Sequence, residues 1–169
     1  MTAQARNGIL YLADRESRQR VLSKKAKYGL KALLRIAGDG TPRLWRAAEL
    51  AEAESIPRKF LEQILLELKK KGLLVSRKGR GGGYQLGKGP DAIFMGEIIR
   101  VLDGPLAPVP CVSVTAYGKC DECLDERTCG IRLVMQEVRD GIAGILDTTS
   151  LADVMHRVNK EGLRPKKGQ

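Results

Sequence analysis

The spacing of apolar residues predicts three short helices in the first half of the chain. Apolar side chains recur every three or four residues over 23–38, 45–53 and 57–71, which is the periodicity of a helix with one buried face. Ser23 is suited to cap the first helix, and Pro57 is suited to the first turn of the third. The residues expected to face inward are Tyr28, Leu30, Leu33, Leu34 and Ala37 in the first helix, Ala48, Leu50 and Ala51 in the second, and Phe60, Leu61, Ile64, Leu65 and Leu68 in the third.

A β-hairpin with a basic tip is predicted after the third helix. Residues 73–76 and 84–86 are expected to be its strands, and RKGRGGG between them is expected to be its flexible tip. Three short helices and such a hairpin predict a winged helix-turn-helix, whose third helix enters the major groove of DNA. The expected fold class is mainly α with a small β-hairpin wing, and a long dimerisation helix follows the DNA-binding domain.

That long helix is predicted over 131–146, after another amphipathic helix over 91–103, and Ser150 is suited to cap a short last helix. The apolar stripe of the long helix is narrow, and no other long helix in the chain is left to cover it. A symmetric partner would cover it, with packing against helix 91–103 as the alternative. The residues of this predicted dimer interface are Ile131, Val134, Val138, Ile142 and Ile145.

These elements divide the chain into six segments. They are an N-terminal extension (1–21), the winged helix-turn-helix domain (22–90), a connecting helix and linker (91–110), a cysteine loop (111–130), the dimerisation helix with a short C-terminal helix (131–158), and a basic tail (159–169). No apolar run approaches the roughly 20 residues of a membrane-spanning helix. The first residues lack the apolar segment of a secretion signal. We therefore expect a cytoplasmic protein with no membrane partner.

The basic charge of the chain is concentrated in the predicted DNA-binding domain. The whole chain carries a net charge of +10, and residues 22–90 alone carry the same net charge, because the flanking segments cancel each other. Such an asymmetry predicts a polyanion-binding module joined to a nearly neutral one. A basic surface kept for solubility is the alternative.

The outward face of the third helix is expected to read DNA bases. Arginine and lysine side chains can pair with guanine, glutamine with adenine, and glutamate with cytosine, although Glu62 could instead form an ion pair within the helix. Contacts to the DNA backbone or minor groove are expected from the wing and from the start of the first helix. The candidate DNA-binding residues are Arg58, Lys59, Glu62 and Gln63 in the third helix, Arg77, Lys78, Arg80 and Gly81 in the wing, and Ser23, Lys24 and Lys25 in the first helix.

All the cysteines of the chain, Cys111, Cys120, Cys123 and Cys129, lie in one polar loop with the spacing C-x8-C-x2-C-x5-C. Such loops commonly supply the ligands of soft metal centres, whereas a core cysteine lies alone in an apolar stripe. The pattern predicts a metal or iron–sulfur site, with a Cys120–Cys123 disulfide switch and inert thiols as alternatives. Structural zinc sites usually have two C-x2-C pairs, so a 2Fe–2S or 4Fe–4S cluster is favoured over zinc.

Three parts of the chain match one known family: LSKKAKYGLKALLRIA, then FLEQILLELKKKGLLVSRKGRGGGYQLGKGPDAIFMGEIIRVLDG, and the cysteine loop ahead of a long helix. Over about residues 22–157 they resemble the IscR/NsrR/CymR family of bacterial transcription regulators, the Rrf2 superfamily. The resemblance implies a cytosolic homodimer that binds palindromic operators. Many members hold an iron–sulfur cluster whose state changes DNA affinity, and others respond through a protein partner or a thiol.

The chain departs from this family at the cluster ligands that the resemblance implies. Cys111, Cys123 and Cys129 match the cysteines of the IscR type, but Arg132 stands in place of its ligating histidine, and arginine cannot ligate. The NsrR type uses a carboxylate of the partner's first helix, and Lys27 stands at that position. Cys120 is an extra thiol, which we expect to be the fourth ligand or a spare; the only histidine is expected at the surface.

The sequence therefore predicts a homodimeric, sequence-specific DNA-binding transcription regulator controlled by an iron–sulfur cluster. The alternative is a regulator of the same kind that is stabilised by zinc or switched by a disulfide. An enzyme is disfavoured because the C-x2-C motif has no strand–turn–helix setting and the chain has no phosphate-binding loop. A protein-interaction module with a basic face is the other alternative.

Overall fold

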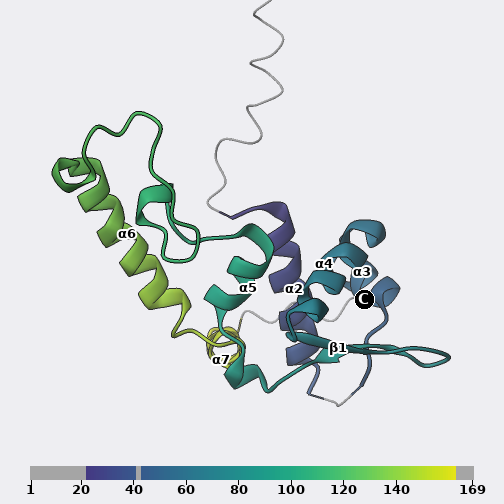
Figure 1. Cartoon of the computed structure of the whole chain (residues 1–169). Helices are drawn as coiled ribbons and strands as arrows, with labels where there is room; N and C mark the ends of the chain where they lie inside the picture. Colours follow the sequence, from purple (N-terminus) through teal and green to yellow (C-terminus); the bar gives the residue numbers. More distant parts are fainter. Residues whose placement is uncertain (1–21, 41–42, 163–169) are drawn as a thin grey trace, which may run out of the picture.

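The computed structural model describes residues 22–40 and 43–162, so the predictions for the 1–21 extension and for residues 163–169 of the tail lie outside it. Figure 1 shows a helical body with the hairpin on one side and a long helix projecting on the other. The elements are α2 (Lys24–Gly38), α3 (Ala47–Ala53), α4 (Arg58–Lys70), β1 (Leu74–Arg77), β2 (Gly83–Leu86), α5 (Met95–Asp103), α6 (Gly130–Leu146) and α7 (Leu151–Lys160), with 3₁₀ turns at Pro90–Ala92, Pro110–Val112 and Glu126–Thr128. The predicted fold class is confirmed.

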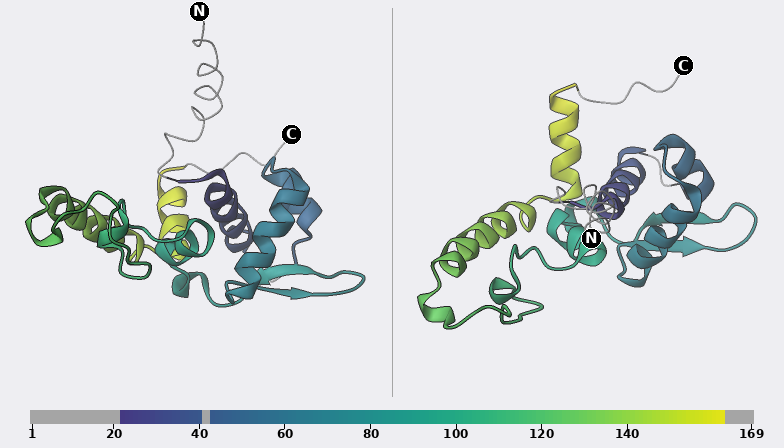
Figure 2. Two further views of the ribbon diagram at one scale, coloured as in Figure 1. Left: turned by 45° about the horizontal axis from the view of Figure 1, so that its top comes forward. Right: turned by 90° about the horizontal axis from the view of Figure 1, so that it is seen from above.

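The core lies between α2, α3 and α4, and α5 and α7 pack against α2 (Figure 2). Ser23 caps α2 as predicted, because its Oγ accepts the backbone N–H of Ala26 at 3.0 Å. The Tyr28 and Phe60 rings meet edge to face with their centres 5.8 Å apart, which ties α2 to α4. The fully buried side chains include Leu33, Leu50, Leu61, Ile64, Leu65, Leu68, Ile98 and Leu151, and each contributes about 1.5–3 kcal/mol through burial.

Helix α3 begins two residues later than predicted, at Ala47. The backbone of Trp45 pairs with Tyr84 of the hairpin, and this pairing holds the chain extended ahead of the helix. The inward position predicted for Ala48 is wrong, because that side chain is exposed. Ala47 packs against the core instead, three residues before the buried Leu50, so both residues lie on one helical face.

Strands β1 and β2 form an antiparallel pair, with Leu74 opposite Leu86 and Arg77 opposite Gly83. The tip between them is shorter than predicted, because the strands include Arg77 and Gly83. Gly79 and Gly81 in the tip have φ values of 96° and 85°, which side chains rarely adopt. The turn of the wing therefore depends on glycine at both positions.

Helix α5 begins at Met95, later than the predicted start at residue 91. Residues 90–92 form a separate 3₁₀ turn, and extended Phe94 pairs with Ser150 in an isolated bridge. Ser150 caps α7 as predicted, through a reciprocal pair of hydrogen bonds with Asp153. Helix α7 ends at Lys160, two residues into the predicted tail.

Helix α6 projects from the rest of the protein, and an ion pair just after its C-terminal end connects it to α5. Arg100 donates two hydrogen bonds to the carboxylate of Asp147, at 2.5 and 2.8 Å, just after the end of α6. A Cβ atom at Gly96 would overlap an oxygen of Asp147, so this close approach requires glycine. No residue of α6 itself is fully buried within the described chain.

We expect Asp147→Asn to lower the free energy of unfolding at pH 7 by about 0.5–1 kcal/mol, because the pair is partly exposed to solvent. Hydrogen bonding from Arg100 lowers the pKa of Asp147, so the pair stabilises the folded state above the ordinary aspartate pKa of about 3.9. That stabilisation is lost as the pH falls through the lower folded-state value. Urea unfolding of both proteins at pH 7, 5 and 3 checks this. An equal difference at pH 7 and pH 3 would contradict it.

Candidate functional site

The outward face of α4 carries the four side chains predicted to read bases. Arg58, Lys59 and Gln63 are exposed and Glu62 is half-buried. The guanidinium Nε of Arg58 lies 2.8 Å from a carboxylate oxygen of Glu62, one helical turn away. The structure therefore shows the intrahelical ion pair that the sequence left open.

Two of the three residues predicted at the start of α2 are bonded within the chain. The backbone N–H and the hydroxyl of Ser23 both donate to the carboxylate of Asp103, at the end of α5. The ammonium of Lys25 lies 2.7 Å from a carboxylate oxygen of Glu67 in α4. Lys24 is exposed. The contact between Ser23 and Asp103 joins the first helix of the DNA-binding domain to the segment that leads into the cysteine loop.

The predicted wing residues are all exposed: Arg77, Lys78, Arg80 and Gly81. Beside the wing lies an open hollow of about 640 Å³, lined by Arg43, Leu44, Val75, Ser76, Arg77, Gly81 and Gln85. Sequence reasoning missed Arg43. Its partners Asp39 and Glu49 are close to it in the sequence, but their contacts depend on the course of the connection between α2 and α3, which apolar spacing does not predict.

The four cysteines of the loop differ in their burial and in their contacts. Cys111 lies in the Pro110–Val112 turn and is buried, whereas the other three cysteines are partly exposed. The Cys123 N–H donates to the Cys120 carbonyl at 3.1 Å, and the Cys129 sulfur accepts the Arg132 N–H at 3.5 Å, capping α6. The first cysteine, Cys111, is therefore buried, and the last, Cys129, lies at the start of the long helix.

Burial raises the pKa of the Cys111 thiol, and its hydrogen bond with Cys120 raises it further. Burial also raises the pKa of Cys123, and Lys119 opposes that rise. Both groups therefore favour the protonated thiol in the protein alone, and a metal that binds them has to displace protons.

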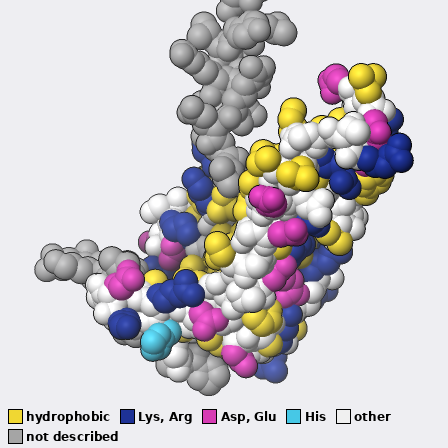
Figure 3. All heavy atoms as spheres, turned by 90° about the vertical axis from the view of Figure 1, so that its left-hand side faces the viewer, with side chains coloured by type: hydrophobic (Ala, Val, Ile, Leu, Met, Phe, Trp, Pro, Cys, Tyr) yellow, Lys and Arg dark blue, Asp and Glu magenta, His cyan; other side chains and the backbone are white. Residues whose placement is uncertain are grey.

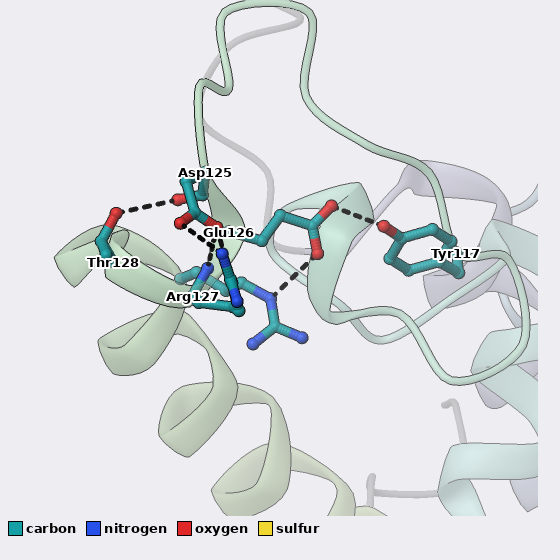
Figure 4. Close-up of polar contacts among 6 residues, drawn as sticks. Tyr117, Asp125, Glu126, Arg127 and Thr128 are labelled. Carbon is teal, nitrogen blue, oxygen red and sulfur yellow. Dashed lines mark hydrogen bonds and ion pairs between the residues drawn. The ribbon is translucent and has the colours of Figure 1, made fainter.

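Figure 4 shows the polar contacts that fix the end of this loop. The Tyr117 hydroxyl donates to one oxygen of Glu126, and the other oxygen lies 3.5 Å from the guanidinium of Arg132 in α6. Next to them, Asp125 accepts the backbone N–H of Arg127 at 3.0 Å, and this bond lowers the pKa of Asp125. Arg132, which stands where a ligand was expected, is thus held by a carboxylate.

Helix α6 presents an uncovered apolar face, part of which is seen in Figure 3. Its exposed apolar side chains include Ile131 (69%), Val134 (49%), Val138 (40%) and Ile145 (65%). Ile142, which the sequence placed in the same stripe, is half-buried, whereas Gly141 is exposed. The predicted stripe is therefore exposed at Ile131, Val134, Val138 and Ile145, and the exposed Leu133 (65%) adds apolar surface beside it.

Comparison with known proteins identifies the family. The sequence profile of Rrf2, described as an iron-dependent transcriptional regulator, matches residues 22–157. The chain belongs to the Rrf2 family. An rrf2-like HTH-type transcriptional regulator of Rhodobacter capsulatus is 41% identical over 138 residues, covering 80% of this chain and 92% of that protein.

Solved Rrf2 structures resemble the fold described above. CymR, the global cysteine regulator of Bacillus subtilis, superposes with a TM-score of 0.66 at 32% identity, covering 80% of this chain and 96% of that one. IscR of T. potens gives a TM-score of 0.66 at 26% identity, covering 90% and 96%. The protein is therefore a DNA-binding transcriptional regulator of a non-enzymatic family. Within the described residues, no helix is long and apolar enough to cross a membrane.

The cysteine loop of this Rrf2 protein suits a soft metal centre by its donor atoms. Thiolates are the ligands of iron–sulfur clusters and of structural zinc, and one loop supplies four of them. Within residues 22–40 and 43–162, no three His, Cys, Asp or Glu side chains are gathered as a metal site. The four thiols are suitable donors for such a centre, but in the described loop they are not gathered around one point.

Proposed function

We propose that this Rrf2 protein is a cytoplasmic homodimer whose affinity for a palindromic operator is controlled by an iron–sulfur cluster in the cysteine loop. The observation that carries the proposal is the position of that loop. It follows Asp103, which is bonded to the start of α2, and it ends at Cys129, whose sulfur caps α6. The loop therefore lies between a segment bonded to one DNA-binding helix and the uncovered helix, so a change in the loop would be transmitted to both through these connections.

The uncovered face of α6 supports pairing of two chains. The exposed Ile131, Val134, Val138 and Ile145 are spaced by three, four and seven residues, which matches the seam of two packed helices. Pairing through such a seam relates the two recognition helices by a two-fold axis. A two-fold protein reads a palindromic site whose half-sites lie about one DNA turn apart.

The ligands that we assign are Cys111, Cys123 and Cys129, with Cys120 as the fourth. A bound cluster would supply redox and iron-dependent chemistry at this loop. Cys129 would hold its ligand position at the N-terminus of α6, where its sulfur accepts the backbone N–H of Arg132. Glu126 holds Arg132 beside the loop and keeps the start of α6 next to the thiols.

DNA contacts are assigned to the exposed side chains of α4, the wing and the start of α2. Gln63 and the Arg58–Glu62 pair are placed to discriminate bases, and Lys59 and Lys24 supply positive charge beside them. The wing residues Arg77, Lys78 and Arg80 are assigned to the DNA backbone.

Protein purified without oxygen is expected to show visible charge-transfer absorption, with iron and sulfide in matching amounts. The four thiols and the iron-dependent description of the family support this expectation. The measurement is an absorption spectrum with iron, sulfide and zinc assayed on the same sample. A colourless protein with stoichiometric zinc would show that the loop holds a structural metal and not a cluster. If neither metal is found after reconstitution, the thiols themselves become the sensor.

A further inference from the structure

The base of the wing is held by a side-chain cluster that the DNA-contact assignment does not use. We call Asp39, Arg43, Trp45 and Glu49 the Arg43 cluster. The Arg43 guanidinium lies 2.6 Å from the carboxylate of Asp39 and 2.5 Å from that of Glu49. Its central carbon stacks 3.7 Å from the ring centre of Trp45. One side chain thus joins the end of α2, helix α3 and the indole.

Trp45 connects this cluster to the hairpin through its backbone. Its N–H donates to the Tyr84 carbonyl, its carbonyl accepts the Tyr84 N–H, and both distances are 2.8 Å. A Cβ atom at Gly83 would lie 2.6 Å from the Trp45 carbonyl oxygen, so the two segments are in close contact. Trp45 is only 6% exposed. The direction of β2, and hence of the wing, depends on where Trp45 is held.

We propose that Arg43 is a positioning residue for the wing: it fixes Trp45, and through Trp45 the strand β2, in the orientation that lets the wing reach DNA. The inference rests on the proposed contact between the wing and DNA. Arg43 itself is not required to touch the nucleic acid.

Charge distinguishes this role from a phosphate contact. The Arg43 guanidinium is paired with two carboxylates, so its positive charge is already offset within the protein. Its two ion pairs and its stacking on the indole require the planar, multi-donor shape of arginine. Lysine has the same charge but a point-like ammonium, so it cannot make all three contacts.

The test compares Arg43→Lys and Arg43→Ala with Arg46→Ala, which removes the same charge from an exposed neighbour. Lys78→Ala serves as the reference for a phosphate contact. The probe is a DNA duplex selected by the wild-type protein from a random-sequence library, titrated over a range of salt concentrations. We expect both Arg43 variants to bind this duplex about tenfold more weakly than the wild type does. The reason is that, before DNA binds, the wing is no longer held in its binding orientation. Their salt slope stays as in the wild type, whereas Lys78→Ala lowers it by about one.

Trp45 is the only tryptophan of the chain, so its fluorescence reports on the base of the wing without DNA. We expect acrylamide to quench it more strongly in both Arg43 variants than in the wild type and in Arg46→Ala. Circular dichroism establishes that each variant is folded, and Arg43→Lys carries the test if the alanine variant is not.

Wild-type affinity of Arg43→Lys, or a salt slope lowered by one in Arg43→Ala, would overturn the positioning role. Unchanged quenching in both variants would overturn it as well. If Lys78→Ala changes neither affinity nor slope, the proposed contact of the wing with DNA fails. If Lys78→Ala behaves as expected and only the Arg43 variants match the wild type, the inference alone fails.

Discussion

Replacing Val138 by aspartate is expected to separate the two chains and to weaken operator binding by about 100-fold or more. Val138 lies in the middle of the uncovered face of α6 and is 40% exposed in the single chain. In a symmetric pair, two aspartates would face each other in an apolar seam, and burying unpaired charges there is costly. A separated chain reads one half-site and loses the gain that comes from linking two binding modules.

Sedimentation velocity measures the mass of the particle, and titration of the selected duplex measures its affinity. Gln136→Asp is the matched control, because it adds the same charge at an exposed position outside the uncovered stripe. We expect that control to pair and to bind as the wild type does. A Val138→Asp protein that keeps the mass of a dimer would show that another surface joins the chains.

The second large effect is expected at the cysteine loop, where Cys123→Ala should remove the visible absorption and most of the bound iron. Cys120→Ala should do the same if all four thiolates hold the cluster, because loss of one ligand leaves an incomplete set. Thr115→Ala, an exposed change in the same loop, should keep the full cluster content.

Iron and sulfide assays on anaerobic protein measure these outcomes, and operator titration shows whether DNA affinity follows cluster content. Full cluster content in Cys120→Ala would limit the ligands of this chain to three cysteines and another group. Full content in Cys123→Ala would exclude Cys123 from the ligands.

Apolar periodicity and local capping patterns predicted the features that are determined by residues close together in the sequence. The stripe of α4 and the cap at Ser23 follow from spacing and local hydrogen bonding, and they were predicted correctly. In α2 only Leu30 and Leu33 of the five predicted residues are buried, the other three are partly buried, and the buried Ile36 was not predicted. The start of α3 was missed because it depends on pairing between Trp45 and Tyr84, which are far apart in the chain. The inward face of α3 was also missed, because Ala47 and Ala48 are adjacent apolar residues and composition alone does not distinguish them.

The candidate sites show the same division between local and distant contacts. The cysteine spacing and the basic wing are visible in the sequence itself. The bond between Ser23 and Asp103 joins residues far apart in the chain, so no pattern of residue types could show it. The Arg43 cluster is local, but it lies in the connection between two helices, where apolar periodicity gives no prediction. Spacing placed Ile142 in the stripe of α6, and only the packing of the helix shows that this side chain is half-buried.

The absence of any fully buried residue in α6 has a consequence for the protein in dilute solution. A helix with little packing of its own is marginal in water. In the proposed homodimer, α6 would therefore gain most of its stability from the partner chain. By mass action, folding of α6 and pairing of the chains would then be a single equilibrium that depends on protein concentration. The number of copies of this regulator in a cell would therefore act alongside the cysteine loop in setting how much of it can occupy an operator.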